Sequence, residues 1–154
     1  MTEPATDHGG RTPDPAPVSP DDVTRAMYAN DHASRALGIV VRTTEIGRAV
    51  TELTVRPDMV NGLDVCHGGI IFTLADSAMA YVSNAGNELA LAVQADIDWV
   101  RPGRLGDVLT ATATTVHRQG RAAVHDVTVA NQHGDTVALF RGRTRVVAGR
   151  HLPA

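Results

Sequence analysis

The segment HGGIIFTLADSAMAYVSN, residues 67–84, decides the fold of this 154-residue chain. On a helix it is apolar nearly all round, and Asp76 is its only charged residue. The apolar run is too short to span a bilayer and contains small residues, so we predict a core helix that other elements must cover. The helix is expected to begin at the Gly68-Gly69 pair and to end between Asn84 and Gly86.

Strand-like segments flank this helix on both sides. Upstream, IVVRTTEI and AVTELTV are separated by Gly47, a pattern typical of a β-hairpin over 39–56. Downstream come four further segments: LALAVQADIDWV, DVLTATATTVH, RAAVHDVTVAN and DTVALFRGRTRVV. In the first of these, apolar residues occupy every second position from Leu91 to Trp99, which predicts one buried face. A curved antiparallel sheet wrapped around the long helix accounts for this order, so we predict an α+β fold.

The two ends of the chain differ from its middle in composition. Residues 1–18 combine Pro, Gly, Asp and Thr with almost no bulky apolar side chains, which predicts a disordered tail. Ser19 as N-cap, Pro20 at the first helical position and Gly38 as a stop predict one helix over about 20–37. We therefore expect a single domain over 19–149, followed by a short tail at 150–154.

The composition excludes several classes of function. A net charge of -3 provides no field that would attract nucleic acid, and all 14 basic residues are arginine, which excludes Schiff-base and P-loop chemistry. The single cysteine, Cys66, cannot form an internal disulfide and is assigned to packing rather than to a Cys/His pair with the adjacent histidine. The histidine spacings match no metal motif, so no metal is expected. The acidic, proline-rich start has no signal-peptide pattern, and we expect a cytoplasmic protein without membrane association.

Asp76 is the first candidate for chemistry. Aspartate is a weak residue for a helix interior, and an ionised carboxylate without partners costs several kcal/mol to bury. Positions that break local preference in this way frequently mark function. The alternative is that Asp76 lies on a solvent-facing strip or caps a neighbouring backbone group.

The N-terminus of the same helix is the second candidate. At His67-Gly68-Gly69 the backbone N–H groups at the positive end of the helix dipole would stabilise an oxyanion, although the glycines also fit a simple turn. Asp76 follows Gly68 by eight residues, or about 12 Å along a helix, too far for both to contact one reacting carbon within a single chain. We therefore predict a homodimer with antiparallel helices, in which the two groups meet across the interface.

The run NGLDVCHGGIIFTLADSAMAYVSN resembles the signature of the PaaI-type hotdog thioesterases. The resemblance extends upstream through MYANDHASRALGI and downstream through VRPGRLGD and TVALFRGRT, over about residues 26–148. The spacing between HGG and LAD carries it, and the MY-ND and ALFRG segments point to the phenylacetate-pathway branch. The resemblance implies a hotdog fold, a homo-oligomer built as a dimer of dimers, and an acyl-CoA substrate, with no cofactor beyond the coenzyme A of that substrate.

The resemblance also implies roles for individual residues. The aspartate matching Asp76 activates water or attacks the thioester, and the N–H of the glycine matching Gly68 polarises the carbonyl. Asn61 matches a position where an amide helps to place the water or the thioester, and Asn30 matches one associated with substrate. Both roles for the aspartate stay open, because the same carboxylate geometry serves both.

Further candidates for substrate contact are distributed along the chain. Three arginines alternate on one face of the last strand, where they would bind coenzyme A phosphates or pair with acidic residues on a solvated face: Arg141, Arg143 and Arg145. Arg101 in VRPG is another candidate for the nucleotide end, and Gly69 is a candidate at the helix terminus. Phe72 and Tyr81 would contact an aromatic acyl group or belong to the core.

The sequence therefore predicts an acyl-CoA thioesterase that prefers aryl-acetyl groups such as phenylacetyl or hydroxyphenylacetyl. One alternative is a general short- or medium-chain acyl-CoA thioesterase with the same catalytic residues. Another is a non-catalytic acyl-CoA-binding module, against which Asp76 argues. A hotdog dehydratase would need a histidine on the helix, and residues 68–84 contain none.

Overall fold

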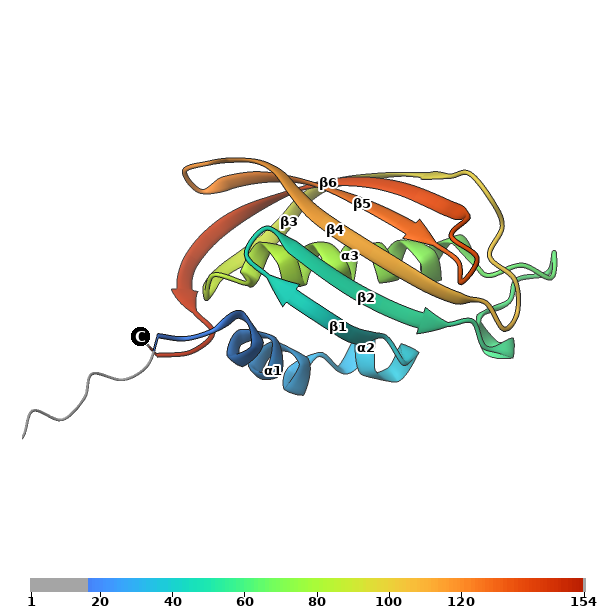
Figure 1. The fold of residues 1–154 in the computed structure, drawn as a ribbon, viewed down its shortest axis with the longest axis horizontal. Helices are drawn as coiled ribbons and strands as arrows, with labels where there is room; N and C mark the ends of the chain where they lie inside the picture. Colours follow the sequence, from blue (N-terminus) through green and yellow to red (C-terminus); the bar gives the residue numbers. More distant parts are fainter. Residues whose placement is uncertain (1–16, 154) are drawn as a thin grey trace, which may run out of the picture.

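One curved antiparallel sheet surrounds a single long helix in the computed structural model, which describes residues 17–153. The helices are α1 (Pro20–Asn30), α2 (His32–Leu37) and α3 (Gly68–Asn84). The strands are β1 (Val40–Glu45), β2 (Arg48–Thr54), β3 (Glu88–Trp99), β4 (Val108–Gln119), β5 (Ala122–Ala130) and β6 (Thr136–Arg150), in the sheet order β1-β2-β4-β5-β6-β3. A short 3-10 turn, η1 (Pro57–Met59), follows β2. Figure 1 shows α3 against the concave face of the sheet, with α1 and α2 beside β1.

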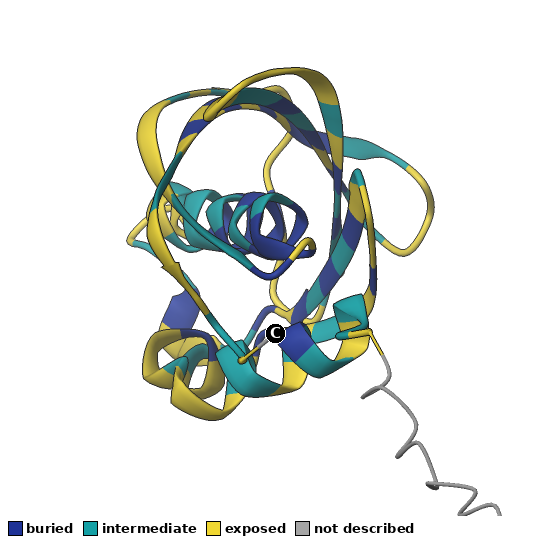
Figure 2. Ribbon diagram, turned by 90° about the vertical axis from the view of Figure 1, so that its left-hand side faces the viewer, coloured by how far each residue is buried: buried dark blue, intermediate teal, exposed yellow. Residues whose placement is uncertain are grey.

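The core lies between α3 and the inner face of the sheet. Leu74 and Met79 of α3 are buried and belong to one cluster with Leu109 and Phe140 of the sheet. Figure 2 shows α3 nearly end-on, enclosed by the strands. Helix and sheet approach each other closely at Gly142, where an added Cβ would overlap the Sδ atom of Met79. The glycine of ALFRG is therefore required by packing, and the predicted α+β arrangement is confirmed.

The N-terminal helical segment is broken, whereas the sequence predicts one helix over 20–37. Asp31 ends α1 and starts α2, with φ -85° and ψ 79°. Its Oδ1 accepts a hydrogen bond from the Ser34 N–H, 2.9 Å, and its Oδ2 accepts one from the Tyr81 hydroxyl of α3, 3.1 Å. The two bonds stabilise the break, because an uninterrupted helix would leave neither oxygen in this position. The segment does stop at Gly38, which has φ +76°.

The burial predicted for β3 is wrong in its first half and at Trp99. The strand lies at the edge of the sheet, and Leu91 and Val93 are 61% and 62% exposed. Its pairing with β6 shifts register just after Ala92, a β-bulge that reverses the phase of the alternation. Only beyond the bulge do Ala95 and Ile97 pack against the core.

The C-terminal segment is attached to the domain. β6 runs to Arg150, past the boundary expected at 149. The side chain of Asn87 bonds both the N–H and the carbonyl of Leu152, at 2.9 and 3.0 Å, and His151 Nε2 lies 2.7 Å from Asn84 Oδ1. The chain through Leu152 therefore belongs to the folded body. Most of the tail predicted over 1–18 lies outside the described residues. No helix within residues 17–153 is long and apolar enough to cross a membrane.

Candidate active site

The N-terminus of α3 offers one unused backbone donor. His67 caps the helix, because its Nδ1 accepts from the Gly69 N–H at 2.9 Å. The His67 carbonyl accepts from the Ile70 and Ile71 N–H groups, at 2.9 and 3.4 Å. Within residues 17–153, the N–H of Gly68 has no hydrogen-bond acceptor. This is the donor expected to polarise a carbonyl, and the positive end of the helix dipole strengthens it.

A hollow of about 310 Å³ opens beside this helix terminus. Asn61, Gly68 and Arg101 line it, so the structure brings three of the expected site residues together. Asn61 lies in the loop before α3, where its Oδ1 accepts from the N–H groups of Leu63 and Val65, at 2.9 and 3.4 Å. These bonds fix the loop and orient the Asn61 amide beside the hollow.

Trp99 also lines the hollow, although the sequence pattern assigned it to a buried strand face. Its Nε1–H donates to the Gly68 carbonyl at 3.2 Å, and 53% of the residue is exposed. A Cβ added to Gly68 would lie 3.1 Å from Cε2 and Nε1 of the indole. The indole thus explains why residue 68 is a glycine. The signal that could have indicated Trp99 is its position two residues before Arg101.

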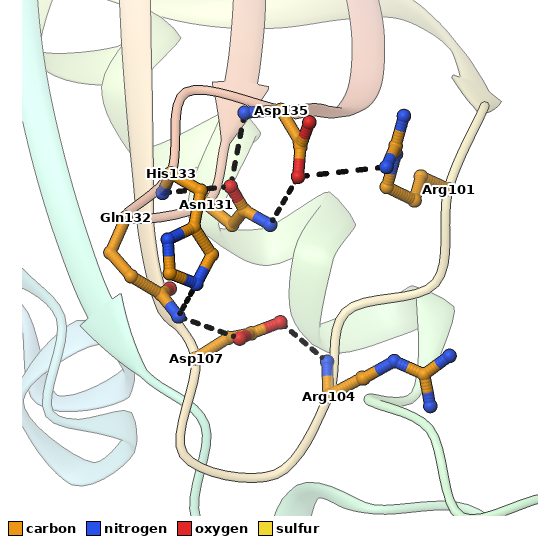
Figure 3. Close-up of polar contacts among 7 residues, drawn as sticks. All are labelled: Arg101, Arg104, Asp107, Asn131, Gln132, His133 and Asp135. Atoms are coloured by element: carbon orange, nitrogen blue, oxygen red, sulfur yellow. Dashed lines mark hydrogen bonds and ion pairs between the residues drawn. The ribbon is translucent and has the colours of Figure 1, made fainter.

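Arg101 is held at the hollow by a polar network (Figure 3). Its guanidinium pairs with Asp135 at 3.5 Å. The side chain of Asn131 holds Asp135 through its N–H, 3.0 Å, and its carboxylate, 3.3 Å. Gln132 bonds Asp107 at 3.0 Å, which ties the same turn to the loop between β3 and β4. Arg101 therefore projects from a loop that is fixed at both ends, with more than half of its side chain exposed.

Asp76 lies two turns further along α3 and does not line the hollow. It is half-buried, and burial raises the pKa of Asp76 from its ordinary value. The hydroxyl groups near it on the helix form hydrogen bonds with other groups. The Thr73 hydroxyl donates to the Gly69 carbonyl at 2.8 Å, and the Ser77 hydroxyl bonds that of Ser34 at 3.2 Å. Among the described residues the Asp76 carboxylate has neither a hydrogen bond nor an ion pair. One chain thus holds the free donor and the unpartnered carboxylate at separate places.

The arginines of β6 lie on the outer face of the sheet, away from the hollow. Arg141 forms a two-bond ion pair with Asp126 of β5, at 2.6 and 2.7 Å, and this guanidinium lowers the pKa of Asp126. Arg143 and Arg145 line another surface hollow on the same face. The shared face is therefore as predicted, and for Arg141 the pairing with an acidic residue, the alternative to phosphate binding, is observed.

Three further candidates lie elsewhere. Phe72 packs edge-to-face on Phe140, with ring centroids 5.3 Å apart, and Tyr81 is buried. Asn30 is exposed at the end of α1, where its amide donates to the Ala26 carbonyl at 3.2 Å. Neither Phe72 nor Asn30 lines the hollow beside Gly68.

Comparison with known proteins decides the family. Residues 63–138 match the thioesterase superfamily. The acyl-coenzyme A thioesterase PaaI of Escherichia coli K12 is 45% identical over 124 residues, which cover 80% of this chain and 89% of the relative. The chain belongs to the PaaI-type thioesterases.

Solved structures of similar proteins have the same fold. The E. coli PaaI protein from the phenylacetic acid degradation operon matches with a TM-score of 0.84 and 43% identity, over 85% of this chain and 95% of the other. A Streptococcus mutans UA159 protein solved with bound acetyl CoA matches with a TM-score of 0.70 and 31% identity, over 73% and 90% of the two chains. The hotdog fold is therefore confirmed, and this PaaI-type thioesterase is a hydrolase of acyl-CoA thioesters.

Proposed function

We propose that this thioesterase hydrolyses aryl-acetyl-CoA thioesters, phenylacetyl-CoA or hydroxyphenylacetyl-CoA, at sites shared between two copies of the chain. The free Gly68 N–H and the unpartnered Asp76 carboxylate on the same helix carry the proposal. The similarity to E. coli PaaI, a protein of the phenylacetic acid degradation operon, supports the aryl-acetyl substrate.

Each group has a defined task in this reaction. The Gly68 N–H stabilises the oxyanion that forms as the thioester carbonyl is attacked, a contribution of roughly 2.7–4 kcal/mol per donor in other acyl-transfer enzymes. Asp76 takes the proton of an attacking water, or attacks the carbonyl itself to form an anhydride that water then opens. In either case the C–S bond breaks, coenzyme A leaves as the thiolate and regains a proton, and Asn61 orients the water or the thioester.

A second copy of the chain completes the site. The exposed edge of β3, with Leu91 and Val93 outside the core, is the surface on which an antiparallel partner would continue the sheet. This arrangement brings Asp76 of one copy toward Gly68 of the other, and two such dimers form a tetramer.

Coenzyme A and the acyl group need further contacts. Arg101 beside the hollow is the first choice for a phosphate, and Gly69 adjoins the bound carbonyl. Arg143 is the second choice, because among the described residues its guanidinium has no carboxylate partner, whereas Arg141 is paired with Asp126. Phe72 would contact the aryl ring, and Asn30 would reach substrate from the partner.

Release of coenzyme A tests the proposal. Wild type should cleave phenylacetyl-CoA and hydroxyphenylacetyl-CoA with a higher kcat/KM than acetyl-, butyryl- or hexanoyl-CoA, and Asp76→Asn should lose roughly 10²–10⁴ in rate. Ser77→Ala is the matched control, since Ser77 is adjacent but turned toward Ser34. Equal rates for all thioesters would favour the general thioesterase, and binding without cleavage would favour the acyl-CoA-binding module.

The shared site has its own test. Sedimentation should show a dimer or tetramer, and mixing Asp76→Asn with a Gly68 variant should restore part of the activity in hybrid dimers. A fully active monomer would contradict the shared site.

A further inference from the structure

Two side chains hold the peptide between Gly68 and Gly69 from opposite ends. Its carbonyl accepts from Trp99 Nε1–H at 3.2 Å, and its N–H donates to His67 Nδ1 at 2.9 Å. Trp99 comes from the end of β3, whereas His67 is the N-cap of α3 itself. The orientation of this first helical peptide therefore depends on a contact between the sheet and the helix.

The end of β3 is itself firmly attached. The residues after Trp99 continue onto β6, because the N–H groups of Val100 and Arg101 both donate to the Val137 carbonyl, at 2.9 and 3.1 Å. Trp99 is paired with Ala138 in the same register. The indole is thus a fixed support, although about half of the residue is exposed and it lines the hollow.

We propose that Trp99 is a positioning and substrate-contact residue of the thioesterase site: its N–H aims the Gly68 donor, and its exposed ring is the wall on which the bound thioester lies. The peptide that Trp99 and His67 hold begins at the Cα of Gly68, and the preceding peptide, which carries the Gly68 N–H, is held through the His67 carbonyl by the N–H groups of Ile70 and Ile71. With both peptides held on either side of the Gly68 Cα, the direction of the Gly68 N–H is set. A Cβ at residue 68 would lie only 3.1 Å from the indole, so the ring packs against the Gly68 backbone too closely to admit a side chain there.

The contact with substrate follows from the shape of the hollow. Gly68 and Trp99 line the same hollow, so a carbonyl oxygen that accepts from the Gly68 N–H there would lie beside the indole. The atoms on either side of that carbonyl then meet an apolar aromatic surface, and a planar aryl-acetyl group gains most from it. The proposal rests on the thioesterase function proposed above and adds an aromatic determinant to it.

Intrinsic fluorescence gives a direct test, because Trp99 is the only tryptophan in the chain. Asp76→Asn, which should bind thioesters without cleaving them rapidly, is titrated with phenylacetyl-CoA while tryptophan emission is recorded. We expect a saturable change in emission, with the Kd that calorimetry gives for the same ligand. If calorimetry detects binding of phenylacetyl-CoA but tryptophan emission does not change, the proposed contact between Trp99 and the substrate is refuted, whatever the activity of the wild type.

Two substitutions separate the two roles. Trp99→Phe keeps a ring against Gly68 and removes the hydrogen bond, so kcat should fall about three- to tenfold with little change in KM. Trp99→Leu also removes the aromatic wall, so KM should rise as well, and more for phenylacetyl-CoA than for acetyl-CoA. If Trp99 only stabilised the fold, both variants would contain less active enzyme, which the binding stoichiometry from calorimetry would reveal. The ratio of kcat/KM for phenylacetyl-CoA to that for acetyl-CoA would then be unchanged.

A failure of the proposal for Trp99 can be told apart from a failure of the proposed thioesterase function. If wild type cleaves no thioester, the function fails, while the fluorescence titration still reports on Trp99. If wild type is active and Trp99→Leu, folded by circular dichroism, keeps both kcat and KM, the inference about Trp99 is refuted.

Discussion

Replacing Asp76 with asparagine should make the protein more stable while it removes most of the activity. Burial raises the pKa of Asp76, so the folded chain binds this proton more readily than the unfolded chain does. The protonated side chain stabilises the fold below the ordinary carboxylate pKa, and this contribution is lost as the pH rises through the raised value. At pH 7 the ionised Asp76 therefore opposes folding, and asparagine relieves that cost.

The exposure of Asp76 sets the magnitude. A fully buried and unpaired carboxylate costs several kcal/mol, but Asp76 is only half-buried and water screens part of its charge. After that discount we expect the free energy of unfolding of Asp76→Asn to exceed that of the wild type by roughly 0.5–1 kcal/mol. For comparison, a shift of one pKa unit corresponds to about 1.36 kcal/mol. For a chain of this length that gain corresponds to about 1–4 °C in Tm.

Calorimetry at two pH values checks both the sign and the cause. Wild type and Asp76→Asn are compared at pH 7 and pH 4.5 at one protein concentration, because assembly alone changes Tm. The difference between them should shrink at the lower pH, because protonation of the wild-type carboxylate removes the cost of burying its charge. Asp98→Asn, an exposed carboxylate on β3, is the control and should change little. A variant that is less stable at pH 7 would refute this reasoning and would mean that the ionised carboxylate has a favourable partner.

Three further predictions concern the fold around the site. Gly142→Ala should lower the free energy of unfolding in urea by about 1–3 kcal/mol, because its Cβ would overlap Met79. Gly86→Ala, where nothing lies within 4 Å of an added Cβ, should be neutral. Equal effects of the two substitutions would rule out the packing explanation. Burial lowers the pKa of His125, so the unfolded chain takes up this proton first and stability should fall as the pH drops below about 6.5. A His125→Gln variant should show a flatter decline between pH 7.5 and pH 5.5, and an identical slope would contradict that assignment. Burial raises the pKa of the Cys66 thiol to about 11, so a thiol reagent at pH 8 should label it only after unfolding; rapid labelling of the native protein would contradict its packing role.

Much of the fold could be predicted because its determinants are local. The apolar run after the Gly68-Gly69 pair is sufficient to place α3, and the strand patterns are sufficient to place the sheet around it. The break at Asp31 could not be predicted, because it depends on Tyr81, a side chain that lies 50 residues away and meets it only in the folded state. The bulge after Ala92 depends in the same way on the register with β6.

The same distinction applies to the candidate site: residues with a local signal could be predicted, and residues whose role depends on strand pairing could not. Gly68 is recognisable from its place at a helix start. Asn61 is recognisable from the resemblance to the family, and Arg101 from its place in the loop before β4. The strand pattern predicts a buried Trp99, because it shows alternation but not the edge of the sheet at which a strand lies. The pairing of Arg141 with Asp126 needs the β5–β6 register, which no spacing within one segment reveals.

The edge position of β3 also matters for how the protein is made. Among the described residues β3 pairs only with β6, which follows it in the sequence after two intervening strands, so β3 has no strand partner until β6 has been made. Its other edge pairs with no strand of residues 17–153, and Leu91 and Val93 beside it are exposed. An open apolar edge is a template for any extended segment, including those of misfolded chains. We therefore expect refolding yield to pass through a maximum with concentration, since dilute chains leave the edge uncovered and concentrated ones aggregate through it before folding is complete.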